Sequence, residues 1–88
     1  MATSTIKKNM RTKTFSKDLT IGGGERISQV FSDSTVNKIV AATLVNSPNR
    51  DWVICRPYIL SDKVVCIYMH NEYTGALSGT LSVLIIYE

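Results

Sequence analysis

The fold is decided by two adjacent runs, WVICRPYIL at residues 52–60 and KVVCIYMH at residues 63–70. Both runs are rich in β-branched and aromatic residues, the types that fit a pleated, half-buried surface. Ser61 and Asp62, the two polar residues between them, predict an antiparallel hairpin with a two-residue turn. Residues 52–70 are therefore expected to form a β-hairpin.

The predicted turn sets the pairing register of the hairpin, because Leu60 then lies opposite Lys63. In this register Cys55 lies opposite Tyr68, and Cys66 is its diagonal neighbour. Alternation along the strands gives two faces. The first face holds Val53, Cys55, Pro57 and Ile59 with Val64, Cys66, Tyr68 and His70. The second face holds Trp52, Ile54, Arg56, Tyr58 and Leu60 with Val65, Ile67 and Met69.

Both predicted faces are largely apolar, whereas an antiparallel sheet with one wet face alternates apolar and polar residues. A chain of 88 residues has little material left to cover the second face. We therefore expect another subunit to cover it, with Tyr58, Val65, Ile67 and Met69 as contact residues. The competing interpretation places the hairpin centrally in a two-layer sandwich, with a loop over one end.

Length and composition limit the protein to one small domain. With 44% hydrophobic and 19% charged residues, the chain is too apolar for a disordered protein. A chain of 88 residues builds only one modest core, which excludes a multi-domain enzyme.

The segments around the hairpin also favour strands. Residues 12–21 alternate as a strand that the glycines at 22–24 interrupt, supplying the positive φ that a tight turn requires. Residues 26–31 form a second short strand. Residues 35–45 fit either a helical stripe or a strand, and six β-branched residues among the eleven favour the strand.

The C-terminal part predicts a loop at residues 71–79 and a final strand at residues 80–87. Pro57 interrupts the first hairpin strand, and we expect a bulge or bend there. The fold class that follows is all-β: a single antiparallel β-sandwich over residues 12–88 with Greek-key or jelly-roll-like connections. Residues 1–11 form a short, flexible, basic arm in this prediction.

The formal net charge of +3 is unevenly distributed, since the first seventeen residues carry +5 and the remainder −2. The positive residues are Lys7, Lys8, Arg11, Lys13 and Lys17. They could contact a polyanion, and a nucleic-acid-binding module is one alternative function. A solvated extension is favoured over nucleic-acid binding, because the charges are dispersed and no aromatic residue precedes Phe15.

No catalytic, cofactor or metal motif is present, and we expect a protein that is not an enzyme and needs no cofactor. Cys55 and Cys66 are predicted to be reduced and buried, and with His70 they supply three soft ligands where a structural zinc site takes four. Tyr73, in the predicted loop, is the one aromatic residue expected to contact a ligand, and a glycan-binding module is a further alternative. Neither a signal peptide nor a membrane-spanning segment is expected.

The order of elements resembles the small β-sandwich domains of tailed-bacteriophage virion proteins of the tail accessory, baseplate, receptor-binding and head-fibre types. The matching segments are KTFSKDLTI, KIVAATLV, WVICRPYIL, KVVCIYMH, HNEYTGALSG and LSVLIIYE, within residues 12–88. The resemblance implies a homo-oligomer, a trimer or a hexamer, with a structural or host-attachment role in the virion after synthesis in the host cytoplasm. Its implied partners are other copies, other virion proteins and a host cell-surface glycan.

Overall fold

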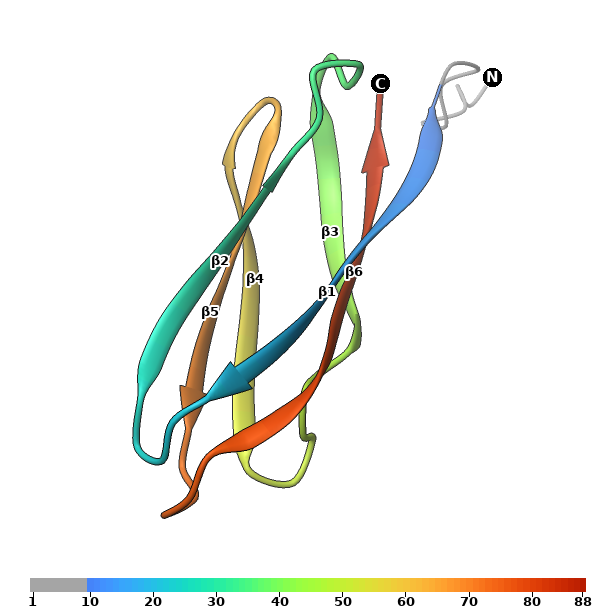
Figure 1. Cartoon of the computed structure of the whole chain (residues 1–88). Coiled ribbons are helices and arrows are strands. Elements are labelled where there is room, and N and C mark those ends of the chain that lie inside the picture. The colour runs from blue at the N-terminus through green and yellow to red at the C-terminus, as the bar shows by residue number, and fades with distance from the viewer. Residues whose placement is uncertain (1–9) are drawn as a thin grey trace, which may run out of the picture.

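The computed structural model describes residues 10–88, and this part of the chain contains strands and turns but no helix. Figure 1 shows the strands in two layers. The six strands are β1 (Arg11–Ile21), β2 (Arg26–Ser32), β3 (Ile39–Asn46), β4 (Val53–Ser61), β5 (Val64–Asn71) and β6 (Leu77–Tyr87). One sheet has the order β1-β6-β3 and the other β2-β5-β4. All strand pairs are antiparallel, and the predicted all-β sandwich is confirmed.

The core lies between the two sheets and is supplied mainly by the two central strands, β5 and β6. Val65, Ile67 and Met69 of β5 and Leu81, Val83 and Ile85 of β6 have no exposed surface. These residues alternate along each strand, so the neighbouring positions point out of the sandwich. Each sheet therefore has one inner face and one outer face.

Several predicted elements are confirmed. Residues 35–45 contain a strand, β3, which begins at Ile39. It begins later than predicted because residues 33–36 form a turn, in which the Val36 N–H donates to the Asp33 carbonyl. The glycine turn is present, and Gly24 has a φ of 73°. The loop after β5 is shorter than predicted, since β6 begins at Leu77.

The predicted register of the β4-β5 hairpin is wrong by one residue. Ser61 pairs with Val64, so the turn is at residues 62–63, and a bulge follows between Ile59 and Ser61. Cys55 consequently lies opposite Met69, whereas the prediction placed it opposite Tyr68. Side chains alternate between the two faces along a strand, so a slip of one residue changes which side chains of β5 share a face with a given side chain of β4.

The bulge expected at Pro57 is also misplaced. Pro57 pairs in register with Ile67, and the irregularity lies nearer the turn. β4 is an edge strand, which is one of the places where a sheet accommodates proline, because a missing N–H at the free edge costs no ladder hydrogen bond.

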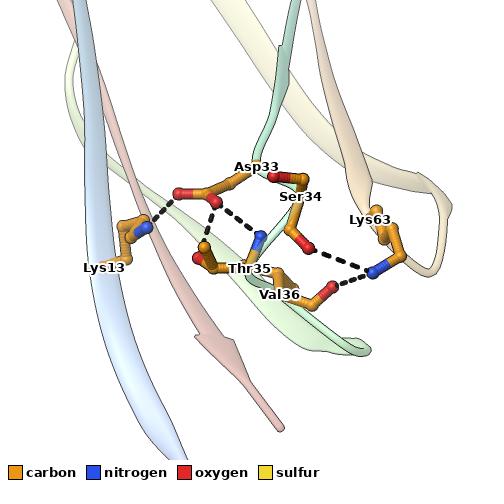
Figure 2. Close-up of polar contacts among 6 residues, drawn as sticks. All are labelled: Lys13, Asp33, Ser34, Thr35, Val36 and Lys63. Carbon is orange, nitrogen blue, oxygen red and sulfur yellow. Dashed lines mark hydrogen bonds and ion pairs between the residues drawn. The ribbon is translucent and has the colours of Figure 1, made fainter.

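Two lysines hold the turn between β2 and β3 in place (Figure 2). Lys13 of β1 forms an ion pair with Asp33, which also accepts hydrogen bonds from the Thr35 N–H and hydroxyl. Lys63, in the hairpin turn, donates to the Val36 carbonyl at 2.6 Å. The pKa of Asp33 is held well below its usual range, first by its bond with Lys13 and then by those from Thr35. The turn thus connects both sheets at one end of the sandwich.

Candidate binding face on the β2-β5-β4 sheet

The outer face of the β2-β5-β4 sheet is the candidate functional surface, and we call it the aromatic face. Its side chains alternate with the buried ones of the same strands. The aromatic face comprises Arg26, Ser28, Val30 and Ser32 of β2, Val64, Cys66, Tyr68 and His70 of β5, and Ile54, Arg56 and Tyr58 of β4.

Large apolar side chains on this face are open to solvent. Val30 is 49% exposed, Ile54 37% and Tyr58 46%. Leu60, in the bulge at the end of β4, is 57% exposed. Single exposed apolar residues are normal on a protein surface, but a contiguous group of them marks an interaction site.

Val30, Cys66 and Tyr58 form one cross-strand row at the centre of the aromatic face. Cys66 is only 4% exposed although it points outward, because its two neighbours cover it. The pKa of Tyr58 is raised, chiefly by its side-chain hydrogen bond with Cys66. The Tyr58 side chain thus lies beside the Cys66 thiol on the outer side of the sheet.

The charge of the aromatic face is of one sign. Strands β2, β4 and β5 contain no Asp or Glu, while Arg26 and Arg56 both point outward. Arg56 lies directly opposite Tyr68, and Arg26 lies opposite His70. The cross-strand neighbours of His70 are thus Arg26 and Ile54, neither of which can activate it as a base.

The outer face of the β1-β6-β3 sheet has a different chemistry, and we call it the hydroxyl face. It presents eight hydroxyl side chains, namely Thr12, Thr14, Ser16 and Thr20 of β1, Ser78, Thr80 and Ser82 of β6, and Thr43 of β3. The apolar side chains Leu84 and Ile86 of β6 and Ala41 of β3 lie among them and are half-buried. Ser16 hydrogen-bonds Ser82, and Thr20 hydrogen-bonds Ser78, each at 2.8 Å. Val40 and Val45 of β3 are exposed on this sheet, but its outer face carries no aromatic side chain, which distinguishes it from the aromatic face.

The structure separates the four residues predicted to contact another subunit. Val65, Ile67 and Met69 lie in the core and are fully buried, so they cannot form a contact surface in the folded chain. Tyr58 lies on the opposite side of the sheet and is exposed. The prediction failed for Val65, Ile67 and Met69 because the predicted hairpin register, which placed them on the same face as Tyr58, is wrong by one residue.

The two cysteines are free and lie on opposite faces of their sheet, not on one face as predicted. Cys55 is half-buried toward the core, and this burial raises the pKa of its thiol. Among residues 10–88 no group of three His, Cys, Asp or Glu side chains lies close enough to hold a metal ion.

Tyr73 lies in the loop between β5 and β6 and is 41% exposed. Its ring packs against Trp52 with the ring centres 5.1 Å apart and the planes tilted by 51°. The side chain of Asn71, which is fully buried, fixes the position of this loop. Its oxygen accepts a hydrogen bond from the Tyr73 N–H, and its NH₂ group donates to the carbonyls of Ile21, Gly22 and Gly75. Trp52 was not predicted as a surface residue because strand residues of this type usually pack in a core.

Of the five basic residues predicted to contact a polyanion, Arg11, Lys13 and Lys17 lie on β1 within the described residues. Lys13 is half-buried, paired with Asp33 and within 5.9 Å of the Tyr87 ring centre. Arg11 and Lys17 are exposed on β1, and Lys7 and Lys8 lie outside the described residues.

Comparison of the chain with protein-family models, with curated proteins and with solved structures found no match. Within residues 10–88 no helix could cross a membrane.

Proposed function

We propose that this chain is a non-enzymatic structural protein that assembles with copies of itself through the aromatic face. The observation that carries the proposal is the contrast between the two outer faces. The hydroxyl face is rich in hydroxyl groups and has no aromatic side chain, whereas the aromatic face exposes Val30 and Tyr58 on either side of Cys66. Ile54 is exposed further along β4. We therefore assign the association to the aromatic face.

The composition of the aromatic face matches that of a protein–protein contact. Interface centres are enriched in Tyr and Arg and depleted in acidic residues. Tyr58, Tyr68 and Arg56 occupy adjacent positions on β4 and β5, and the three strands contain no acidic residue. Burial of the half-exposed apolar side chains is worth about 1 kcal/mol each, so association depends on several of them acting together.

The proposed setting is the virion of a tailed bacteriophage, with a structural or host-attachment role. The resemblance of residues 12–88 to small virion sandwich domains supports this setting. Detection of the protein in stoichiometric amount in purified particles, by mass spectrometry, tests it. Absence from intact particles would contradict the virion role and leave self-association to be judged separately.

The test of self-association is the molar mass in solution, measured by light scattering after size-exclusion chromatography. The wild-type protein should exceed the 9.8 kDa of a monomer at high micromolar concentration. Tyr58→Ser should shift the mass toward the monomer. Val45→Ser is the matched control, because Val45 is 54% exposed but lies on β3 of the other sheet. A wild-type monomer, or equal effects of the two substitutions, would refute the proposal.

A second candidate function, glycan binding, is favoured by one specific observation. Trp52 and Tyr73 form an exposed aromatic pair at one end of the sandwich, and aromatic rings with a polar edge suit contacts that are partly wet. Trp52 is the single tryptophan, so its fluorescence reports on the site directly. Titration with host cell-wall polysaccharide should change this fluorescence in the wild type and not in Tyr73→Ala. An unchanged signal in the wild type excludes the site.

A further inference from the structure

The sandwich has four edge strands, and three of them carry a feature that blocks pairing with another strand. β1 directs Lys13 and Lys17 toward the inner side, since they pair with the buried Ile85 and Leu81. β3 has two register shifts along its pairing with β6. β4 carries Pro57 and a register shift near its end. Inward-pointing charges, bulges and prolines are the means by which edge strands avoid association.

β2 is the exception among these edges. Its pairing with β5 runs without a shift from Arg26 to Ser32, and its sequence RISQVFS contains no proline, glycine or lysine. Stacking of Phe31 on Phe15, with ring centres 5.2 Å apart, holds the strand against β1 of the other sheet. β2 therefore presents a regular and well-supported edge.

The hydrogen bonds show which backbone groups of β2 are available. The Asn71 N–H donates to the Glu25 carbonyl at 3.0 Å, so Glu25 faces β5. In an antiparallel pair the residues face the partner strand alternately. Ile27, Gln29 and Phe31 thus bond to β5, and Ser28 and Val30 direct their N–H and C=O groups to the free edge. The Gln29 side chain donates to the Val30 carbonyl at 3.0 Å, which covers one of these acceptors.

From these observations we infer that two copies of the chain join along β2, antiparallel, about a twofold axis at Gln29. The pairing places Ser28 opposite Val30 of the second copy, and Ile27 opposite Phe31, so inner side chains meet inner side chains. Arg26 lies opposite Ser32, which keeps the two Arg26 side chains apart. The Ser28 N–H of one copy replaces the Gln29 amide on the Val30 carbonyl of the other.

A second copy fits this edge for a further reason, namely continuity with the aromatic face. In the proposed pairing the two Val30 side chains become diagonal neighbours on the outer side. The two three-stranded sheets then form one six-stranded sheet, and the two aromatic faces form one surface. A twofold contact of this kind gives a dimer, or a hexamer built from three dimers, whereas it cannot by itself close a trimer.

This inference rests on the proposed self-association, and amide hydrogen exchange resolved by residue separates the two. In dilute, monomeric protein the amides of Ser28 and Val30 should exchange fast while those of Ile27 and Gln29 are protected. At concentrations where the mass shows association, exchange at Ser28 and Val30 should slow at least tenfold. An associated protein in which these two amides stay fast refutes the β2 contact but not the self-association. A protein that stays monomeric refutes both.

Two variant pairs test the contact and its register. Ser28→Pro removes an N–H that the monomer does not use, so it should lower the associated mass while the far-ultraviolet circular dichroism stays that of the folded chain. Ser28→Ala, which keeps the N–H, should associate like the wild type. Gln29→Cys should give a disulfide-linked dimer on mild oxidation, because opposite residues at a non-hydrogen-bonded position have Cα atoms about 4.5 Å apart. Ile27→Cys should not, and equal cross-linking by both variants refutes the register.

Discussion

Replacement of Asn71 by alanine should cost this protein a large part of its stability. The Asn71 side chain is fully buried and makes four hydrogen bonds. Three run from its amide to the carbonyls of Ile21, Gly22 and Gly75, at 2.9, 3.1 and 3.0 Å. The fourth is accepted from the Tyr73 N–H at 2.8 Å. One side chain thus joins the end of β1, the glycine turn and the loop before β6.

The size of the effect follows from these bonds. Each intramolecular hydrogen bond contributes about 1 kcal/mol net, and a buried polar group left without a partner costs about 1–3 kcal/mol. Asn71→Ala should therefore lower the free energy of unfolding by about 3–5 kcal/mol. A domain of this length has a total of roughly 4–13 kcal/mol. The melting temperature should fall by more than about 10 °C.

The assay is urea unfolding followed by circular dichroism, with the fluorescence of Trp52 as a second signal. Asn46→Ala is the matched control, since Asn46 is exposed and its side chain donates one hydrogen bond, to the Thr80 carbonyl. The control should lose about 1 kcal/mol or less. Asn71→Asp separates bonding from packing, because it keeps the shape but lacks the amide NH₂ group that donates to the three carbonyls, and it should be destabilised as well. A loss for Asn71→Ala no larger than that of the control would refute the reasoning.

Two other predictions concern the ends of the sandwich. The pKa of Asp33 lies below its ordinary value of 3.8, so the bond with Lys13 stabilises the fold above that pH and is lost as the pH falls further. The wild type should be more stable than Asp33→Asn at pH 7, and the difference in unfolding free energy should shrink below about pH 4; a constant difference would contradict this. Gly79→Ala should destabilise the fold strongly, because its Cβ would lie 2.1 Å from the Pro48 carbonyl oxygen, whereas Gly75→Ala, with ordinary 3.5 Å contacts, should melt near the wild type.

The sequence was sufficient to predict that the strands exist, but it was not sufficient to predict the register of the β4-β5 hairpin. Alternation and β-branched content correctly indicated the strand in residues 35–45, and three glycines correctly indicated the turn after β1. The hairpin turn depends on Lys63, whose ammonium group donates to the Val36 carbonyl in a distant turn. This contact to a segment far away in the sequence accompanies the placement of Lys63 in the turn, and local turn preferences contain no information about it.

The same one-residue slip explains why the candidate site was predicted only in part. Tyr58 was assigned to the exposed face correctly, but its companions there are Val30 and Cys66, not Val65 and Ile67. Val30 comes from β2, which no hairpin pattern connects to β4. One signal in the sequence could have pointed to this surface: the segments that became β2, β4 and β5 contain no acidic residue.

The β4-β5 hairpin does carry more apolar surface than the described chain covers, but on other residues than those predicted. Both faces of β5 carry apolar side chains, and the β1-β6-β3 sheet covers only the inner one. On the outer side Tyr58 lies opposite Cys66, and at the other edge of the sheet β2 is regular and unpaired within the described chain. A strand added at that edge by a second copy would extend the sheet and enlarge the apolar surface at once. Strand pairing thus brings the two Val30 side chains together and joins the two aromatic faces into one larger surface, while Tyr58, on β4 at the other edge of each sheet, stays exposed on that surface.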